Sequence, residues 1–362
     1  MQHASDSYSF STPQGSTRVH YYDERTCVPK VEKQVGKYNA LYVCDEHTLP
    51  LLQAADNFTG DVPLVCLPAG EQYKDMQCVE QIITVAVQAE LDRNALFIAF
   101  GGGVVCDMTA FAASLYLRGV RCMLVPSTLL AMADASIGGK TAVNFSMYKN
   151  LIGTFYAASD VFMCLPLLQQ LAEHEYRAGL AEILKVGVLY EPALYRMFLE
   201  QRHAIMQRDP ACIGKLIRLA TQAKARIISE DFTEQGERRF LNFGHTFAHA
   251  LESISCFSML HGDAVAWGMA RALALGTLLN ITDQAYAQAL TELLRTYGWC
   301  TEPFYAGAQL TENRKTYGDA LIEAMRKDKK KHNGSIRFIL QKTLQSNIIL
   351  EVDETLIRKV LQ

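Results

Sequence analysis

The chain has 362 residues, about half of them hydrophobic and a fifth charged, which suffices for two ordinary cores, and two domains are predicted. A formal charge of −3 and a pI near 6.3 exclude an overall basic field of the kind that attracts nucleic acid or an anionic membrane. No apolar run reaches the roughly 18 residues that span a bilayer, and residues 1–13 resemble neither a signal nor a transit peptide. The ten cysteines include no C-x-x-C pair, so we expect reduced thiols and a cytoplasmic protein.

The first half of the chain alternates short apolar runs with helical stretches. The runs Ala40–Cys44, Leu64–Leu67, Leu96–Phe100 and Arg121–Val125 suit strands that are buried on both faces. Their alternation with helices predicts a doubly wound, largely parallel sheet, a Rossmann-like α/β domain over residues 1–165.

A glycine turn follows one of these predicted strands. Gly101, Gly102 and Gly103 lead into a predicted helix, Val104–Leu117, as in the turn that lets a backbone approach a pyrophosphate. The third glycine of the dinucleotide fingerprint is replaced by Cys106. A purely structural tight turn is the alternative.

A second glycine-rich turn, Gly138–Thr141, ends like a phosphate-binding loop. Asp134 stands where that loop needs its first glycine, which excludes an NTPase of that type. Lys140 then lies near Asp134, Lys149 and Asn150 as a candidate anion site, or the two lysines are ordinary surface residues.

The second half changes to helical periodicity and predicts a mostly α-helical domain over residues 166–362. The predicted helices are Tyr176–Leu189, Cys212–Ser229, Phe243–Ser253 and Ala264–Leu279. One late apolar run, Ser335–Leu340, predicts a strand.

Three histidines and a carboxylate fall within this helical half. His245 and His249 are four residues apart, which puts both on one face of a helix, and His261 begins a further predicted helix. Glu182 shares a helix face with Lys185. The residue after the first histidine is threonine, which disfavours the zinc protease motif. Two histidines and a carboxylate would suit a Lewis-acidic Zn²⁺, whereas hydrogen-bonded or surface histidines are the alternative.

A basic run, Arg326–Lys331, is interrupted only by Asp328. Such a run is usually a solvated helix end, although one lysine could contact a phosphate or carboxylate. Nucleic-acid binding is disfavoured because no aromatic residues interleave with the lysines.

Taken together, these segments resemble the 3-dehydroquinate synthase family, from about Asp45 to Phe338. The segments that carry the resemblance are Gly70–Lys74, Gly101–Asp107, Tyr116–Gly119, Pro126–Leu130, Asp134–Thr141, Lys149–Gly153, Ala181–Lys185, Leu241–His249, His261–Asp263 and Lys327–Lys330. Departures from the usual pattern are Cys106, Tyr148, Ala248 and Pro166-Leu167.

The resemblance implies a set of site residues between an NAD-binding domain and a helical domain. Zn²⁺ or Co²⁺ would be held by Glu182, His245 and His261. NAD would be bound by Asp45, Glu71, Lys74, Gly102, Gly103, Asp107, Thr128, Lys140 and Lys149. Substrate would be contacted by Lys140, Asn150, Lys185, Lys224, Arg238, Asn242, His249 and Lys329, with Asp134 beside the metal and substrate and Arg118 reaching across a homodimer.

The resemblance also implies an activity, the conversion of 3-deoxy-arabino-heptulosonate 7-phosphate into 3-dehydroquinate and phosphate in the shikimate pathway. That reaction combines transient oxidation by NAD, phosphate elimination, re-reduction and intramolecular aldol closure. The partner would be a small sugar-acid phosphate, with no nucleic acid or membrane. The alternatives are another sugar-phosphate cyclase, of the 2-deoxy-scyllo-inosose or valiolone type, and a metal-dependent alcohol or glycerol dehydrogenase. A catalytically silent scaffold member is disfavoured, because it would not need Glu182, His245, His261 and the lysines.

Overall fold

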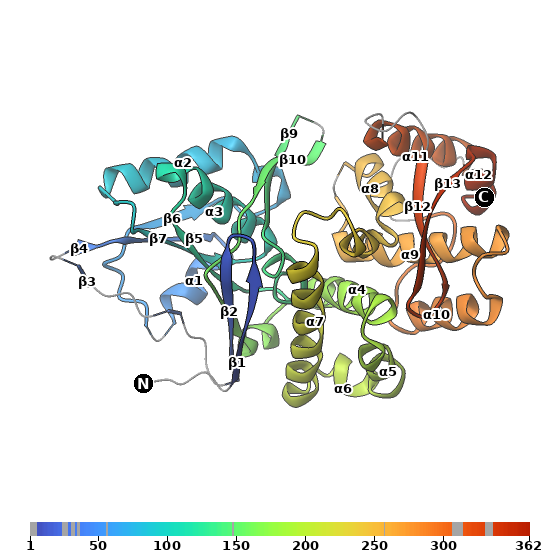
Figure 1. Ribbon diagram of the computed structural model, residues 1–362, viewed down its shortest axis with the longest axis horizontal. Helices are drawn as coiled ribbons and strands as arrows, with labels where there is room; N and C mark the ends of the chain where they lie inside the picture. Colours follow the sequence, from blue (N-terminus) through green and yellow to red (C-terminus); the bar gives the residue numbers. More distant parts are fainter. Residues whose placement is uncertain are drawn as a thin grey trace. The chain divides into compact units, whose positions relative to one another are not determined.

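The computed structural model describes residues 6–23, 28–29, 33–34, 37–55, 57–146, 148–256, 258–305, 314–329 and 336–362, without the side chains of 33–34, 37–38, 314–316 and 327–329 (Figure 1). The chain forms two compact units. Unit 1 comprises Met1–Ala172 and Gln207–Thr233, and unit 2 comprises Glu173–Met206 and Glu234–Gln362. A single cut after residue 165 does not describe this division, because the segment 207–233 packs with unit 1.

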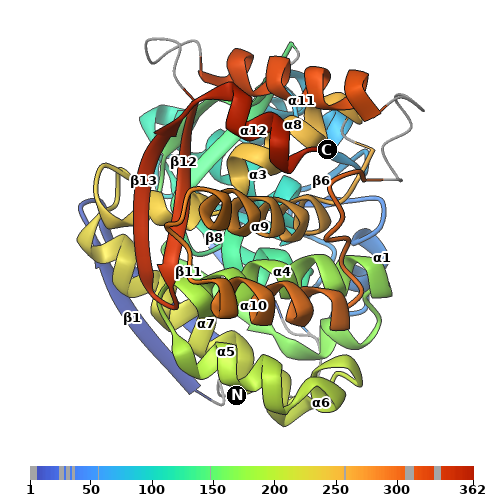
Figure 2. The ribbon, with the colours of Figure 1, turned by 90° about the vertical axis from the view of Figure 1, so that its right-hand side faces the viewer.

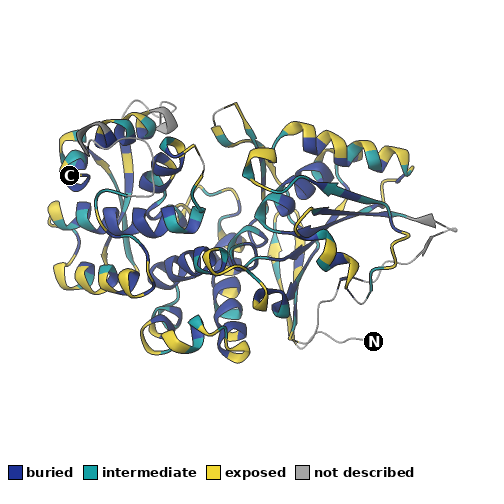
Figure 3. Ribbon diagram, turned by 180° about the vertical axis from the view of Figure 1, so that it is seen from behind, coloured by how far each residue is buried: buried dark blue, intermediate teal, exposed yellow. Residues whose placement is uncertain are grey.

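Unit 1 is built on a seven-stranded sheet with the order β1-β2-β11-β8-β7-β5-β6. Its strands are β1 (Asp6–Thr12), β2 (Gly15–Tyr22), β5 (Ala40–Asp45), β6 (Leu64–Leu67), β7 (Leu96–Gly101), β8 (Arg121–Pro126) and β11 (Asp160–Cys164). All neighbouring strands are parallel except β1 and β2. The four strands predicted from apolar runs are confirmed, and Figure 3 shows the central strands in dark blue, the colour of buried residues.

The strand order reverses beside β5. This strand pairs with β6 on one side, and the chain then returns to place β7 on its other side. In parallel α/β sheets, ligands bind outside the carboxyl ends of the strands at such a switch point. The carboxyl end of β5 carries Asp45 and that of β7 carries the glycine turn at Gly101.

Helices and a hairpin complete unit 1. The helical elements are α1 (Leu49–Gln53), α2 (Met76–Gln88), α3 (Gly103–Leu115) and α7 (Pro210–Glu230), with short turns η1 (Glu71–Tyr73), η2 (Tyr116–Arg118), η3 (Ala131–Ala135) and η4 (Leu165–Gln169). The strands β9 (Lys140–Phe145) and β10 (Tyr148–Phe155) form an antiparallel hairpin that packs against α3, and β3 (Lys33–Gln34) pairs with β4 (Lys37–Tyr38). The helix predicted to run to residue 117 ends two residues earlier, because Leu117 has a positive φ of 49°.

Unit 2 is mostly helical, as predicted, with one β-hairpin. Its elements are α4 (Glu173–Leu189), α5 (Pro192–Glu200), α6 (Arg202–Met206), η5 (Glu237–Asn242), α8 (His245–Ile254), α9 (His261–Leu278), α10 (Gln284–Thr296), α11 (Arg314–Lys329), β12 (Ile336–Thr343), β13 (Ser346–Val352) and α12 (Glu354–Val360). In Figure 2 the helix α9 lies at the centre of this unit, and it contacts α4, α8, α10, α12 and β12. Since a helix that is apolar on most sides belongs in a core, the alanine- and glycine-rich sequence of α9 explains this position.

The described part of the chain contains nine cysteines, all of them free thiols. Within the same residues, no helix has an apolar stretch long enough to cross a bilayer.

Candidate active site

Three helices of unit 2 bring Glu182, His245 and His261 together. Glu182 lies in the buried middle of α4, whereas the histidines are the first residues of α8 and α9. Glycines allow these helices to approach closely, because a Cβ on Gly262 would come within 2.0 Å of the carbonyl oxygen of Ala178 in α4. At the start of α8, Gly244 has a φ of 82°, a conformation that side chains other than glycine rarely adopt.

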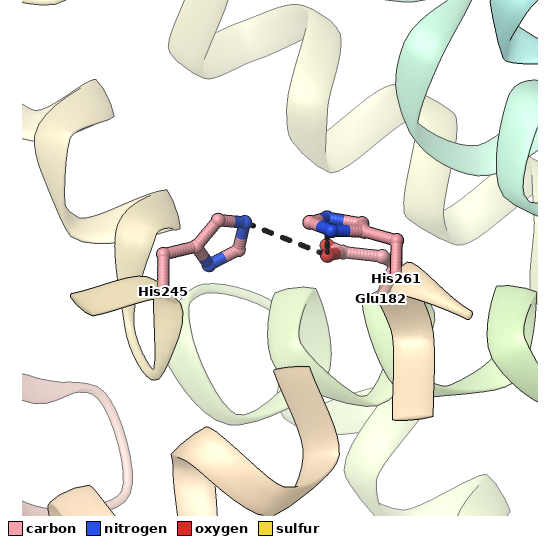
Figure 4. Close-up of side chains that lie close together, drawn as sticks. All are labelled: Glu182, His245 and His261. Atoms are coloured by element: carbon pink, nitrogen blue, oxygen red, sulfur yellow. Dashed lines mark ion pairs between the residues drawn. The ribbon is translucent and has the colours of Figure 1, made fainter. Parts of the chain in front are cut away.

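The spacing of these three side chains fits a divalent cation. Each residue offers one ligand atom, and the three atoms lie within 4.8 Å of one another. The Nε2 atoms of His245 and His261 lie 3.7 and 3.4 Å from Oε1 of Glu182, and Figure 4 shows both rings turned toward this oxygen. Tetrahedral ligands placed about 2.0–2.1 Å from zinc are roughly 3.3 Å apart. The cluster is therefore close to the geometry that such an ion requires.

The chemical state of the Glu182 carboxylate also suits a cation. The side chain is 1 % exposed, and among the described residues neither oxygen accepts a hydrogen bond of good geometry. Burial raises the pKa of Glu182, but the positive charges of Lys185 and His261 outweigh burial and lower it to about 2. A buried, ionised carboxylate whose oxygens lack well-formed hydrogen bonds is stabilised when a cation binds it.

The two histidines differ in protonation. Burial, together with the nearby charges of Lys185, His249 and His261, lowers the pKa of His245 well below its ordinary value. For His261 burial also lowers the pKa, but Glu252 and Glu182 outweigh it and raise the pKa to about 10. At neutral pH, His245 is thus ready to bind a metal, whereas His261 must first lose a proton.

Other predicted substrate residues lie in the same unit. Lys185 forms a buried ion pair with Glu182 one helical turn away. His249 is exposed on α8, with its ring centroid 5.3 Å from that of His245. In η5, Arg238 is buried, and Asn242 donates a hydrogen bond to Glu234. The side chain of Lys329 lies outside the described residues.

A second polar cluster lies in unit 1 around Lys74. Its ammonium contacts Oδ2 of Asp107 and Oδ1 of Asn150, each at 2.6 Å. Burial raises the pKa of Asp107 more than Lys74 lowers it, whereas the fields of Asp107 and Glu71 outweigh burial for Lys74 and raise its pKa. The pair is ionised, because the 2.6 Å separation is the length of a charge-assisted hydrogen bond.

Asn144, in β9, links this cluster to Glu71 and was not predicted. Its side-chain amide donates to Oε1 of Glu71 at 3.0 Å, and its Oδ1 accepts the backbone N–H of Asn150 at 2.9 Å. Its own backbone N–H donates to the carbonyl of Lys74 at 2.7 Å. The pairing of two distant segments through one side chain leaves no periodic signal in the sequence.

A further ion pair in unit 1 joins Asp134 and Lys224. The Lys224 ammonium lies 2.5 Å from both Oδ1 and the carbonyl oxygen of Asp134. Lys224 belongs to α7, and its packing against η3 brings together residues 90 positions apart.

The glycine turn has the form expected of a dinucleotide site. Gly102 is the N-cap of α3 and has no side chain that could accept a hydrogen bond from the first amides of the helix. Uncapped amides at a helix N-terminus favour a negatively charged ligand. A Cβ on Gly102 would lie 3.4 Å from Thr128. The Cys106 side chain is buried, with Sγ 3.7 Å from the carbonyl oxygen of Gly101, so this departure from the fingerprint occupies the core side of the turn.

The remaining predicted residues of unit 1 are more dispersed. Asp45 caps the turn after β5 by accepting the hydroxyl of Thr48 at 2.7 Å. Lys140 begins β9 opposite Phe155, so the hairpin separates it from Asn150, which lies beside Asn144. Lys149 is half-buried on β10. Arg118 is exposed and has a positive φ of 68°.

Comparison with protein families covers both units. The model of the 3-dehydroquinate synthase N-terminal domain matches residues 64–178, and that of the C-terminal domain matches residues 179–331. The chain belongs to the 3-dehydroquinate synthase family. A 3-dehydroquinate synthase of Picosynechococcus sp. is 39 % identical over 86 % of this chain and 83 % of its own length. One from Shewanella sp. is 34 % identical over 90 % of each chain.

Solved structures with the same fold include sugar-phosphate cyclases and, at lower TM-scores of 0.61–0.64, alcohol and glycerol dehydrogenases. The 2-epi-5-epi-valiolone synthase of Streptomyces hygroscopicus subsp. jinggangensis 5008, with NAD⁺ and Zn²⁺ bound, has a TM-score of 0.79 and is 27 % identical over 89 % of this chain and 90 % of its own. A 2-deoxy-scyllo-inosose synthase, complexed with carbaglucose-6-phosphate, NAD⁺ and Co²⁺, has a TM-score of 0.82 and is 22 % identical over 98 % of this chain and 99 % of its own. These similarities confirm the predicted fold, in which an α/β domain is followed by a mostly helical domain.

Proposed function

We propose that the protein is a 3-dehydroquinate synthase that converts 3-deoxy-arabino-heptulosonate 7-phosphate into 3-dehydroquinate and phosphate, with NAD and Zn²⁺ or Co²⁺. Family membership across both units supports this activity. The observation that carries it is the cluster of Glu182, His245 and His261, because a sugar-phosphate cyclase of this kind needs a cation next to the substrate hydroxyls.

The residues present fit the proposed cofactors. Glu182, His245 and His261 would hold the cation, and the glycine turn with Asp45, at the carboxyl ends of β7 and β5, would receive the dinucleotide. When bound, NAD supplies a reversible hydride acceptor and the divalent cation supplies a Lewis acid.

The chain's own charged side chains would orient a substrate that carries a carboxylate and a phosphate. In this proposal the substrate contacts are Lys140, Asn150, Lys185, Lys224, Arg238, Asn242, His249 and Lys329, with Asp134 holding Lys224 in place. Their positive charges and amide N–H groups stabilise the charge that grows on the leaving phosphate as its C–O bond breaks. The proton from the adjacent carbon leaves with the phosphate group. After phosphate has left, holding both reacting ends of the remaining chain in one site favours the intramolecular aldol closure.

The NAD contacts are proposed on the same basis. Lys74 and Asp107 form a charged pair whose position is fixed by Asn144 and Asn150, and Glu71, Gly102, Gly103, Thr128, Lys140 and Lys149 complete the set. Because Lys74 is almost fully buried, its pair with Asp107 is held in a fixed position before any ligand arrives.

The decisive experiment offers the heptulosonate phosphate to purified protein with divalent metal and less than one equivalent of NAD, and follows inorganic phosphate. Many turnovers per NAD, without net NADH at 340 nm, are expected. No phosphate release with the protein folded and metal-loaded would overturn the proposal. Net NADH formation would instead indicate an alcohol or glycerol dehydrogenase.

A second candidate is a cyclase of the valiolone or 2-deoxy-scyllo-inosose type, favoured by the likeness to the Streptomyces valiolone synthase. Arg238 and Lys224 argue for a substrate with a carboxylate. Sugar phosphates that lack the carboxylate separate the two activities. Faster phosphate release from these than from the heptulosonate phosphate would favour the second candidate.

We further propose a cytoplasmic homodimer in which Arg118 reaches the partner's site. Exposed apolar side chains of unit 1 support an interface, since Leu117, next to Arg118 in the chain, is 51 % exposed and Phe145 and Tyr148 at the tip of the hairpin β9–β10 are 52 % and 49 % exposed. Sedimentation analysis tests the assembly. Activity restored by mixing Arg118→Ala protein with a variant inactivated at its metal cluster would support a shared site, because hybrid dimers then carry one intact site.

A further inference from the structure

The two histidines of the metal cluster present the same nitrogen to Glu182 but are held from behind in different ways. Nε2 of each faces the Glu182 carboxylate. Nδ1 of His245 lies 3.3 Å from the backbone carbonyl of Phe243, whereas Nδ1 of His261 lies 3.2 Å from Oε1 of Glu252. One ring is therefore held by a neutral acceptor and the other by a carboxylate.

Glu252 is an unusual residue for its position. It lies on α8, one residue from the exposed Ser253, yet its side chain is 0 % exposed. Burial of a carboxylate costs several kcal/mol unless partners compensate for it. No step of the proposed reaction uses it, and it lies outside the segments that carry the family resemblance.

We propose that Glu252 is a positioning residue for the metal centre, which accepts the Nδ1–H of His261 and thereby fixes the tautomer that presents Nε2 to the cation. The inference rests on the proposed metal site. An imidazole can bind a metal through only the nitrogen that carries no proton, so an acceptor on the opposite nitrogen selects the binding form.

The negative charge of Glu252 would also affect the bound cation. A carboxylate behind His261 makes the ring a stronger donor and adds a negative charge near the cation, which the carbonyl behind His245 does not. The cluster is thereby asymmetric, with its stronger imidazole ligand on α9. Loss of such an outer partner typically weakens metal binding tenfold to a hundredfold.

The test uses the full chain, stripped of metal and titrated with Zn²⁺ against a chromophoric chelator. Glu252→Gln keeps an acceptor oxygen of nearly the same shape but removes the charge, and Ser253→Ala is the matched control on the same helix. We expect Glu252→Gln to bind Zn²⁺ 10- to 100-fold more weakly while the control stays within twofold. The unfolding temperature of the metal-free Gln variant is measured alongside, because loss of the charge that faces protonated His261 can lower stability whether or not a metal binds.

A second readout examines the ion itself. In Co²⁺-loaded protein, the visible d–d bands report ligand strength and geometry, and Glu252→Gln should shift them whereas Ser253→Ala should not. Should Glu252→Gln fail to fold, Glu252→Asp serves instead, since it keeps the charge but withdraws it by one methylene, and weaker Zn²⁺ binding is again expected.

The outcomes separate the inference from the proposed function. Tight Zn²⁺ binding by wild type and by Glu252→Gln alike, with unchanged Co²⁺ bands, overturns the positioning role and leaves the metal site intact. A lower unfolding temperature in the metal-free variant with unchanged Zn²⁺ affinity also overturns it, because that is a purely structural effect. If wild-type protein binds neither ion, the metal site itself fails.

Discussion

The buried carboxylates of unit 1 and unit 2 differ in the partners that face them. In unit 1, the ammonium groups of Lys74 and Lys224 each meet a carboxylate at 2.5–2.6 Å, so these charges are paired within the protein. In unit 2, Glu182 is also paired, with Lys185, but two imidazoles face its other oxygen at 3.4–3.7 Å, which is longer than a hydrogen bond. The unit 1 pairs are thus closed, whereas the cluster around Glu182 keeps the spacing that an added cation requires.

The largest effect is expected from His245→Ala. The variant should lose its divalent metal, and phosphate release should fall by more than about a thousandfold, because the Lewis acid is lost while the core of unit 2 is not. Metal content by atomic absorption and phosphate release are the measurements. NAD affinity should stay within a few-fold, since the predicted NAD residues belong to unit 1. Full activity in metal-free protein would contradict the assignment.

The next largest effect is a loss of stability, expected when the ion pair between Lys74 and Asp107 in unit 1 is broken. Lys74→Met leaves Asp107 without its partner and should lower the free energy of unfolding by about 3 kcal/mol, because one half of a buried ion pair has been removed. The double variant Lys74→Met/Asp107→Leu should recover most of that loss but not the activity. Denaturant unfolding without NAD checks this, and Zn²⁺ affinity should stay unchanged. Equal destabilisation in both variants would show that the pair is not coupled.

The pH dependence of metal binding sharpens the comparison further. Since His261 has a pKa of about 10 and that of His245 is lowered, binding near pH 8 should release about one proton, and affinity should rise by up to about tenfold per pH unit from pH 7 toward 10. Titration calorimetry in buffers of different ionisation enthalpy measures the proton count. Release of no proton would mean that His261 is already neutral.

Metal-free protein should show the opposite trend. The folded-state pKa of His261 lies above its unfolded value of about 6.5. Its contribution to stability is therefore fully present below about pH 6.5 and is lost as the pH rises through about 10. Thermal unfolding after chelation, compared between pH 6.5 and 9.5, checks this sign, and His261→Gln is the control that should flatten the difference.

The smallest effect is expected from Asn144→Ala. Loss of its hydrogen bonds to Glu71 and Asn150 should weaken NAD binding by roughly five- to thirtyfold, which corresponds to one or two hydrogen bonds of about 1 kcal/mol each. Equilibrium titration with NAD measures it, with metal content as the unchanged quantity. An unaltered NAD affinity would remove Asn144 from the pocket's support.

Local patterns in the sequence predicted where strands and helices form better than they predicted which elements pack together. The apolar runs at Ala40–Cys44 and Leu96–Phe100 form β5 and β7, because a strand that is buried on both faces needs apolar residues at nearly every position. The helix after the glycine turn ended early at Leu115, since a left-handed residue inside an apolar stretch leaves no periodic signal. Helix α7 was predicted, but its packing in unit 1 was not.

By itself, the sequence determined four central strands of unit 1, the main helices of unit 2, the glycine turn and the residue types that could bind a metal, since each depends on neighbours along the chain. Only the tertiary structure decided that Glu182, His245 and His261 converge, that Cys106 faces the core, and that Asn144 and Glu252 support the two clusters. These relations join segments that are far apart in the sequence or lie on different helices. They depend on how closely those helices and strands pack, which is a property of the folded chain.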